Sequence, residues 1–204
     1  MAKAREERRR ARKAKTFRRR VIALIAVVAV VVALVLFYQF GRPSPEPEPN
    51  KVLLRTSMGD ITIQLYDDMP ITTGNFRKLV KQGVYDGTIF HRVIDDRTPY
   101  MIQGGDPTTK TGDGDPNIPT IPDEFTDHNR NDRGTIAMAN AGPNTGSSQF
   151  FINIADNNYL DDAHPVFGEV ISGMDVVDAI SKVQTDDTDR PVEPVTIISA
   201  ELVE

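Results

Sequence analysis

Hydrophobic and polar residues alternate in short runs over most of the chain after residue 50. The segment 60–66, DITIQLY, places Ile61, Ile63 and Leu65 on one face of a strand and mainly polar side chains on the other. The preceding run, 51–57, is rich in β-formers, and a Met-Gly pair separates the two runs, which predicts a hairpin. Six further runs bounded by Gly, Pro, Asn or Asp are predicted as strands: 88–94, 100–106, 134–140, 148–154, 164–171 and 195–203.

Two segments have helical spacing instead. Pro70 begins a run in which apolar side chains recur at helical intervals, and Gly83 is a suitable end. Residues 174–183 place apolar side chains on one side of a second helix. Eight short strands in a small domain predict a mostly β fold, a closed antiparallel barrel without exposed edges, capped by these two helices. The Gly-, Pro- and Asp-rich segment 107–131 is expected to form a long surface loop.

A different pattern precedes the β-rich part of the chain. Residues 21–40 contain no charged side chain, and apolar residues lie on all sides of the predicted helix. At about 1.5 Å per residue this run can cross a hydrocarbon layer roughly 30 Å thick. A buried core helix would show an amphipathic stripe, and a cleaved signal peptide would have a shorter apolar region and a small-residue cleavage site. We therefore expect one uncleaved transmembrane helix.

Charge divides the chain at the same place. Residues 1–20 carry eleven Lys and Arg against two Glu, whereas residues 50–204 carry twelve basic and twenty-five acidic side chains. Basic residues stay on the cytoplasmic side of a membrane helix, so we expect a single crossing of the cell membrane, a cytoplasmic tail at 1–20 and an extracytoplasmic domain. Attraction to anionic lipid is a simpler role for this tail than nucleic-acid binding, and no nucleic-acid partner is expected.

The segment 41–50, GRPSPEPEPN, alternates proline with Ser and Glu, which favours an extended, semi-rigid linker. Residues 51–204 then have the size of one domain with a single hydrophobic core. The expected organisation is therefore a basic tail, an anchor at 21–40, this linker and one β-rich domain.

The candidate reactive residues exclude several kinds of chemistry. The chain has no cysteine, so neither disulfides nor thiol catalysis is expected. Its three histidines, His91, His128 and His164, show no paired spacing, and its acidic turns lack the spacing of a calcium loop, so we expect no metal. Ser147 and Ser148 do not stand in a nucleophile elbow, which argues against serine hydrolysis.

The segment 140–152, NAGPNTGSSQFFI, changes abruptly from small polar residues to an aromatic run. A glycine-rich turn can hold phosphate on its main-chain amides, whereas a polar turn before an aromatic strand can line a groove for an extended peptide. This segment lacks the Lys of a nucleotide-binding loop and precedes a strand instead of a helix, so the phosphate interpretation is the weaker one.

Four motifs, taken together and in this order, resemble the cyclophilin family of peptidyl-prolyl isomerases: FHRV at 90–93, YMIQGGD at 100–106, MANAGPNTGSSQFFI at 138–152 and YLDDAHPVFGEV at 159–170. The resemblance extends from Lys51 to the C-terminus. It implies an eight-stranded antiparallel barrel with two helices, in agreement with the strand and helix pattern. It also implies proline-containing polypeptides as partners and no cofactor, and the short anchored form favours a bacterial origin.

The resemblance implies a set of site residues as well. The catalytic arginine of the family falls on Arg92, and the glutamine of the QGGD signature, which orients that arginine or the substrate, falls on Gln103. The substrate-binding residues implied in the same way are Tyr100, Met101, Ala139, Asn140, Ala141, Gln149, Phe151, Tyr159, Leu160 and His164.

Three departures from the family pattern bear on these residues. The segment 95–99, DDRTP, makes the turn between Arg92 and Gln103 longer than is common in the family. Tyr100 stands where phenylalanine is usual. Tyr159 stands where many eukaryotic members have a tryptophan that hydrogen-bonds cyclosporin, which predicts at most weak binding of that drug.

These residue types suit rotation about the peptide bond that precedes proline. Rotation breaks amide resonance at a barrier of about 18–20 kcal/mol, and in the twisted state the proline nitrogen becomes an acceptor that an arginine can meet. We therefore expect an isomerase that assists the folding of extracytoplasmic polypeptides. Two alternatives stay open: a membrane-tethered module that binds proline peptides or acts as a chaperone with incidental catalysis, and an extracytoplasmic calcium-binding adhesion domain.

Overall fold

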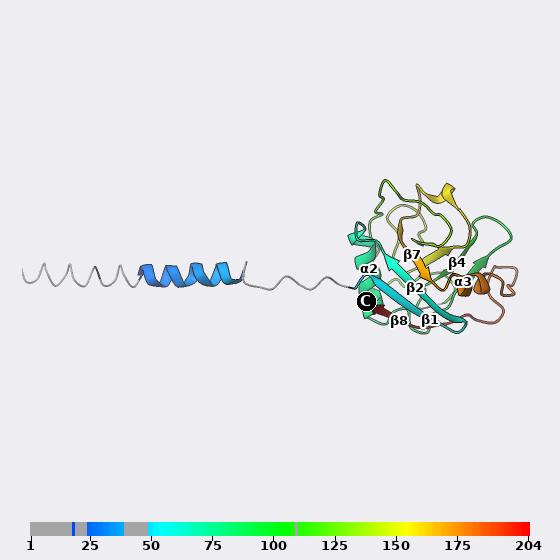
Figure 1. Cartoon of the computed structure of the whole chain (residues 1–204), viewed down its shortest axis with the longest axis horizontal. Coiled ribbons are helices and arrows are strands. Elements are labelled where there is room, and N and C mark those ends of the chain that lie inside the picture. Colours follow the sequence, from blue (N-terminus) through cyan, green and yellow to red (C-terminus); the bar gives the residue numbers. More distant parts are fainter. Residues whose placement is uncertain (1–17, 19–23, 39–48, 109) are drawn as a thin grey trace, which may run out of the picture. The chain divides into compact units, whose positions relative to one another are not determined.

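The computed structural model describes residues 18, 24–38, 49–108 and 110–204, and Figure 1 follows the chain through them. Contacts divide the chain into two units, Met1–Glu48 and Pro49–Glu204. In the first unit residues 24–38 are helical, and no helix in the described part of the chain has both the length and the apolar run that a membrane crossing needs. The remaining residues of the predicted anchor and linker, 21–23 and 39–48, and all of the basic tail except Arg18, lie outside the described residues.

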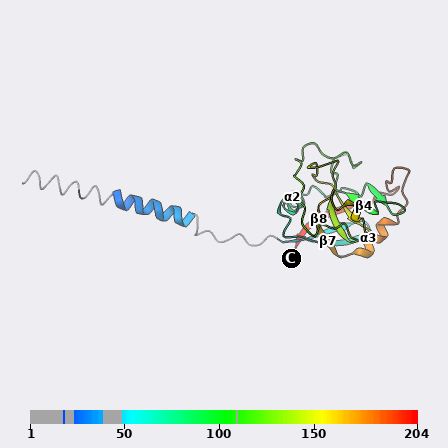
Figure 2. The same ribbon diagram turned by 90° about the horizontal axis from the view of Figure 1, so that it is seen from above.

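The second unit is an antiparallel sheet of eight strands with two helices, as the pattern predicts. The strands are β1 (Lys51–Thr56), β2 (Gly59–Leu65), β3 (Arg92–Ile94), β4 (Met101–Gly104), β5 (Thr135–Met138), β6 (Phe150–Asn153), β7 (Val166–Ser172) and β8 (Ile197–Val203). The helices are α2 (Pro70–Lys81), α3 (Met174–Ser181) and a short 3-10 turn, η1 (Asn158–Leu160). In both views α2 and α3 lie on opposite sides of the domain (Figures 1 and 2).

The prediction of a closed barrel is wrong. The strand order is β3-β4-β6-β5-β7-β2-β1-β8, so β3 and β8 are the edges of an open sheet. The segment that precedes β3 contacts the segment that leads into β8 outside the ladder, for example through a bond from Phe90 N to Val195 O at 3.0 Å and an isolated bridge between Ile89 and Thr196. The chain leading into β8 contains Pro191 and Pro194, which have no N–H to donate, so a continuous ladder cannot form there.

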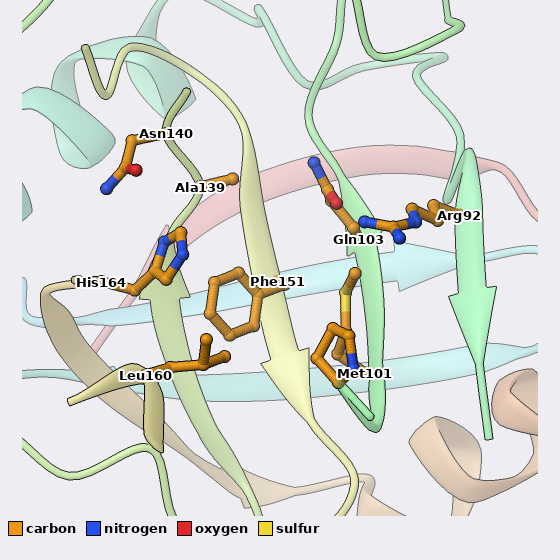
Figure 3. Close-up of a pocket in the computed structure, with 9 residues that line it drawn as sticks. Arg92, Met101, Gln103, Ala139, Asn140, Phe151, Leu160 and His164 are labelled. Carbon is orange, nitrogen blue, oxygen red and sulfur yellow. The ribbon is translucent and has the colours of Figure 1, made fainter. Parts of the chain in front are cut away.

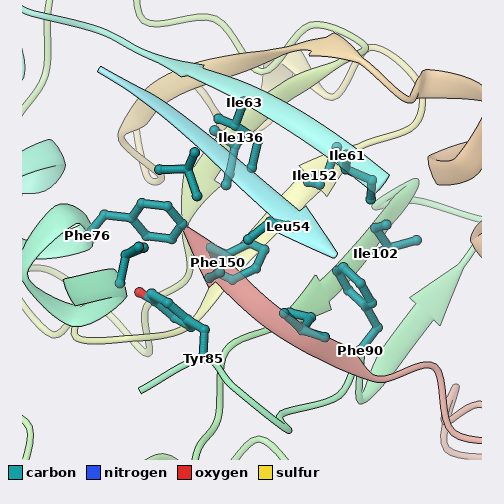
Figure 4. Packing of buried hydrophobic residues seen from close by; sticks show 14 of the residues in the cluster. Leu54, Ile61, Ile63, Phe76, Tyr85, Phe90, Ile102, Ile136, Phe150 and Ile152 are labelled. Atoms are coloured by element: carbon teal, nitrogen blue, oxygen red, sulfur yellow. The ribbon is translucent and has the colours of Figure 1, made fainter. Parts of the chain in front are cut away.

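Alternation along the strands sorts the side chains onto two faces. The inner face forms the main core around Phe150, whose ring centroid lies 5.6 Å from those of both Phe76 and Tyr85 (Figure 4). The outer face of β3 to β7 carries a smaller buried cluster, composed of Ile94, Met101, Ala137, Phe151 and Val166. Because neighbouring residues point to opposite faces, Phe150 belongs to the core and Phe151 to the outer cluster.

The segment between β4 and β5 contains no helix or strand among its described residues, as expected for a loop, but carboxylates fix it to the domain. Near its start Asp106 accepts a hydrogen bond from Gly112 N at 2.8 Å. Further on, Glu124 accepts from Thr72 N at 2.9 Å and also from Ile71 N. Glu124 thus satisfies the first amides of α2, whose own N-cap residue, Met69, provides no side-chain bond.

Candidate active site

A pocket of about 220 Å³ opens on the outer face of the sheet, over β3, β4 and β6 (Figure 3). Its lining residues are Arg92, Pro99, Met101, Gln103, Ala139, Asn140, Phe151, Leu160 and His164. The structure therefore brings together most of the site residues predicted from the sequence, although Arg92 and His164 lie 72 positions apart along the chain, and it adds Pro99.

The centre of the pocket is a row across three strands. Arg92 of β3 stands opposite Gln103 of β4, and Gln103 stands opposite Phe151 of β6. Directly opposed residues of antiparallel strands have Cβ atoms about 4.5–5.5 Å apart and share one face. The sheet thus places a cation, an amide and an aromatic ring side by side, with Met101 on the same face two residues from Gln103 (Figure 3).

The polar side of the row is fixed by a relay of amides. Gln103 Nε2 donates to Gln149 Oε1 at 3.0 Å, and Gln149 Nε2 donates to the carbonyl of Gly112 at 2.8 Å. With its NH₂ group directed to Gln149, Gln103 presents its oxygen on the side of Arg92 (Figure 3). Gln149 is therefore a supporting residue behind Gln103 and does not line the pocket itself.

Arg92 is half-exposed, and an acidic residue holds one end of its guanidinium. Arg92 Nε lies 3.6 Å from Asp189 Oδ2, while the other carboxylate oxygen of Asp189 accepts a hydrogen bond from Arg97. The Asp189 carbonyl accepts from Val93 N at 2.8 Å, which ties this acid to the residue after Arg92. Arg97 belongs to the long 95–99 turn, so that turn contributes a charge beside the site.

The other half of the pocket is apolar with one imidazole. His164 Nδ1 donates to the Met138 carbonyl at 3.1 Å, because a carbonyl can only accept. Its ring meets Phe151 edge-on, with centroids 5.3 Å apart and planes at 83°. Met101, Phe151 and Leu160 then form an apolar socket that extends from the side of Arg92 toward His164 (Figure 3).

One rim of the pocket offers main-chain groups to a ligand. The Asn140 side chain is anchored, because Nδ2 donates to the Ala163 carbonyl at 2.8 Å. The N–H and C=O of Asn140 make no hydrogen bond to another described residue, although Ala139 N still donates to Gln149 O at 3.1 Å. An extended peptide that passes this rim can therefore bond to the Asn140 main chain.

Four of the predicted site residues lie outside the pocket lining: Tyr100, Ala141, Gln149 and Tyr159. Ala141 is exposed in the turn after Asn140, and Tyr159 is 59% exposed on η1. Tyr100 lies just before β4, where it lines a separate depression with Arg133. Pro99, in the bend that precedes it, lines the pocket instead.

A network of buried asparagines supports the pocket walls, and sequence reasoning missed it. Asn157 makes two hydrogen bonds to the main chain of Tyr100. Asn157 Nδ2 donates to the Tyr100 carbonyl at 2.8 Å, and Tyr100 N donates to Asn157 Oδ1 at 3.1 Å. It also donates to Asn153 Oδ1, and Asn153 donates to Asn131 Oδ1 at 3.2 Å. Asparagine usually indicates a turn, so the sequence carries no signal that these three are fully buried.

A second cavity, of about 420 Å³, adjoins the pocket beyond Arg92 and Gln103, and His91 lines it. His91 is only 5% exposed, and its Nδ1 has no hydrogen-bond partner among the described residues. Burial lowers the pKa of His91 below its ordinary value of 6.5, although nearby Asp106 acts in the opposite direction.

His91 therefore makes folding sensitive to acid. Below pH 6.5 the unfolded chain protonates this histidine while the folded chain keeps it neutral, so the stabilising contribution is complete above that pH and is lost as the pH falls. We expect thermal melts between pH 7 and 5 to show a steeper loss of Tm for the wild type than for His91→Gln. Parallel curves for the two proteins would contradict the role of His91.

Among the described residues, no group of three or more His, Asp or Glu side chains is placed to hold a metal ion. The chemistry of the pocket is that of a permanent cation, hydrogen-bonding amides and an apolar socket. Such a site can bind a small apolar ring and stabilise an electron pair that develops beside it.

Comparisons with known proteins agree with this geometry. The profile of the family described as "Cyclophilin type peptidyl-prolyl cis-trans isomerase/CLD" matches residues 51–202. The chain is 49% identical over 155 residues to peptidyl-prolyl cis-trans isomerase ppi1 of Schizosaccharomyces pombe, covering 73% of this chain and 96% of that protein. It is 42% identical over 164 residues to peptidyl-prolyl cis-trans isomerase CYP18-2 of Arabidopsis thaliana, covering 78% and 98%.

Solved structures give the same result. A crystal structure of a Cryptosporidium parvum cyclophilin type peptidyl-prolyl cis-trans isomerase in the presence of the dipeptide Ala-Pro has a TM-score of 0.69 and 31% identity, covering 76% of this chain and 99% of that one. The match covers the domain that carries the pocket, where Arg92 and the proline-sized socket lie. This chain therefore belongs to the cyclophilin family of peptidyl-prolyl cis-trans isomerases.

Proposed function

We propose that this cyclophilin accelerates rotation of X-Pro bonds at the pocket around Arg92, and that it does so on polypeptides outside the cytoplasm, as a folding assistant held at a membrane by residues 21–40. The observation that carries the catalytic part is the row formed by Arg92, Gln103 and Phe151. That row places a group that is always charged against an apolar socket on a rigid sheet.

The reaction makes and breaks no covalent bond, so the protein needs only to bind the twisted amide better than either planar isomer. Twisting removes the proline nitrogen from amide resonance and gives it a lone pair. A guanidinium N–H of Arg92 donates to that lone pair, and the apolar socket strengthens the bond by excluding water. The Asp189 contact at Arg92 Nε leaves the terminal NH₂ groups of Arg92 for this role.

The remaining lining residues hold the substrate on either side of the rotating bond. The socket of Met101, Phe151 and Leu160 takes the pyrrolidine ring. The Asn140 main chain binds the residue before the proline, so one end of the amide is held while the other turns. The structure of a relative determined in the presence of Ala-Pro supports a proline-containing ligand for this pocket.

Charge and hydropathy of the N-terminal segment support the membrane part of the proposal. Eleven basic residues precede a run of twenty without charge, and one Arg, at position 42, follows it before residue 50. Within the helical residues 24–38, the apolar side chains are exposed, from 49% at Leu36 to 70% at Phe37. Large apolar side chains on all sides of a helix are stable in lipid and unfavourable in water.

Attachment to lipid can be tested by flotation. We expect the full chain to float with liposomes of phosphatidylcholine and phosphatidylglycerol after reconstitution, and to stay with them in 1 M salt or at alkaline pH. Val30→Lys together with Val31→Lys puts two charges in the middle of the run, at a cost of about 2.5–3.5 kcal/mol each, and we expect these to release the protein. A wild type that salt removes from liposomes would contradict the anchor.

Catalysis is tested by exchange spectroscopy on proline peptides. Uncatalysed cis-trans exchange of an X-Pro bond takes about 10–100 s at 25 °C. We expect the full chain to make the exchange of an Ala-Pro peptide much faster than that. Binding of the peptide without faster exchange would favour the proline-binding module instead. A large loss of thermal stability on addition of a chelator would favour the calcium-binding alternative.

A further inference from the structure

The second cavity lies next to the proline pocket and has a different chemistry. The two share Arg92 and Gln103, and the larger one is lined by His91, Arg92, Gln103, Thr111, Gly112, Thr188 and Arg190. Its described lining contains two guanidinium groups and no carboxylate. The lining is therefore polar and basic, although residues 50–204 as a whole have an excess of acidic residues.

The acidic residues near this cavity already have partners. Asp189 binds Arg97 and Arg92. Asp186 accepts from the Thr188 N–H at 2.8 Å and from the Thr188 hydroxyl at 2.7 Å. Asp106 accepts from main-chain amides, including Gly112 N. Local hydrogen bonds therefore compensate these charges, and they leave the cationic lining available to an incoming group.

Arg190 is the second cation of this lining. Among the described residues no carboxylate lies within ion-pair distance of its side chain, although Asp186 is near enough to interact with it electrostatically, and its main chain is fixed. Arg190 N donates to Asp186 Oδ1 at 3.1 Å, and its carbonyl accepts from Asp186 N at 2.8 Å. Because the main chain of Arg190 is fixed, less conformational entropy is lost when its guanidinium binds an anion.

His91 adds a second, independent observation. It is 95% buried, it lines this cavity, and its Nδ1 lacks a partner among the described residues. That nitrogen is itself buried, whereas the Nε2 edge of the ring lies against Gly112, which also lines the cavity. The cavity thus combines two guanidinium groups with a buried imidazole in its wall.

The position of the cavity indicates which part of a substrate reaches it. Asn140 and Ala139, which hold the residues before the proline, lie on the opposite side of the pocket from Arg92 (Figure 3). The second cavity extends beyond Arg92. A peptide that is held at Asn140 and has its proline ring in the socket therefore continues toward the second cavity with the residues that follow the proline.

We propose that the second cavity is a subsite for the carboxylate of an Asp or Glu in one of the two residues that follow the proline, with Arg190 as its cationic partner. This inference rests on the proposed isomerase function and specifies its substrate class. Arg92 contributes to both cavities, so an acidic residue at this place also draws the substrate toward the catalytic cation.

The test compares matched peptides with the full chain. Two acetylated, amidated peptides carry Glu at the first or at the second residue after Ala-Pro, and each has a Gln counterpart, so that the only variable carboxylate is the one tested. We expect exchange spectroscopy to give a kcat/KM about fivefold higher for Glu than for Gln in at least one pair, because a partly exposed ion pair contributes about 1 kcal/mol. We expect this ratio to fall toward one in 0.5 M salt.

Variants of Arg190 test the residue. We expect Arg190→Gln to bring the Glu/Gln ratio to about one, and Arg190→Glu to favour a Lys peptide over the Glu peptide. Arg55→Gln is the matched control, because Arg55 lies outside both cavities and pairs with Glu201 at 3.6 Å on the β1–β8 edge; it should keep the wild-type ratio. Thermal melts verify that each variant is folded.

The outcomes separate this inference from the proposed function. If the wild type accelerates neither peptide, the isomerase proposal fails. If it accelerates both members of each pair equally, or if Arg190→Gln leaves the preference unchanged, the isomerase stands and the subsite is wrong.

Discussion

We expect Arg92→Ala to lower kcat/KM for a proline peptide by about 100- to 1000-fold while the domain stays folded. The size follows from removal of a fixed donor that acts on charge present only in the transition state. The fold is retained because the Arg92 side chain is 43% exposed and its acidic neighbour, Asp189, keeps Arg97 as a partner. Exchange spectroscopy on an Ala-Pro peptide, beside a thermal melt, measures both parts of the prediction.

A conservative replacement separates the charge of Arg92 from its shape. Arg92→Lys keeps the cation but loses the planar set of donors, so we expect its activity to lie between those of the wild type and the alanine variant. Arg55→Ala removes an exposed arginine of β1 and serves as the control with wild-type turnover. Unchanged turnover by Arg92→Ala would falsify the role of Arg92 and shift the assignment to other residues of the pocket.

The largest effect on stability is expected one residue away from the site. Phe150 is fully buried and packs against the rings of Phe76, Tyr85 and Phe90. Its replacement by alanine leaves a cavity among rigid aromatic neighbours, and we expect the free energy of unfolding to fall by about 3–5 kcal/mol. In thermal melts this corresponds to a Tm lower by roughly 10 °C.

The neighbouring phenylalanine is the matched comparison. Phe151 belongs to the outer cluster and forms the floor of the proline socket. We expect Phe151→Leu, which keeps most of the apolar volume, to lose less than about 1.5 kcal/mol of stability. It should raise KM for the proline peptide, because the flat wall of the socket is lost. Equal losses of stability at positions 150 and 151 would contradict the division of β6 into a core face and a site face.

Phe150 and Phe151 show how much of the site could be predicted from the sequence. The alternation in FFIN predicts that Phe150 and Phe151 point to opposite faces, but not which face is the core. The motif resemblance adds that Phe151 meets the substrate. The resemblance also assigns Tyr100 to the wall of the site, but Tyr100 lies outside the pocket lining and Pro99, from the long 95–99 turn, is part of it, which only the folded structure shows.

The long-range polar contacts could not be predicted from the sequence, for a different reason. Asp189 acts on Arg92, and Glu124 acts on the start of α2, but neither pair has a fixed spacing along the chain. The buried asparagines and the second cavity depend on how loops fold over the sheet, so local preference cannot indicate them. The proline residues before β8, in contrast, were visible in the sequence, and their missing N–H groups explain why the sheet stays open.

The sequence by itself determined the mostly β fold with eight strands and two helices, the family, and the residue types of the site, because hydrophobic periodicity and ordered motifs are local properties of the chain. It also carries the charge and hydropathy pattern on which the membrane proposal rests. The tertiary structure decided that the sheet is open and that Pro99 and not Tyr100 lines the socket. It alone placed Asp189 beside Arg92 and brought Arg190 into the lining of a second cavity, because strand register and loop packing bring together residues that no local pattern connects.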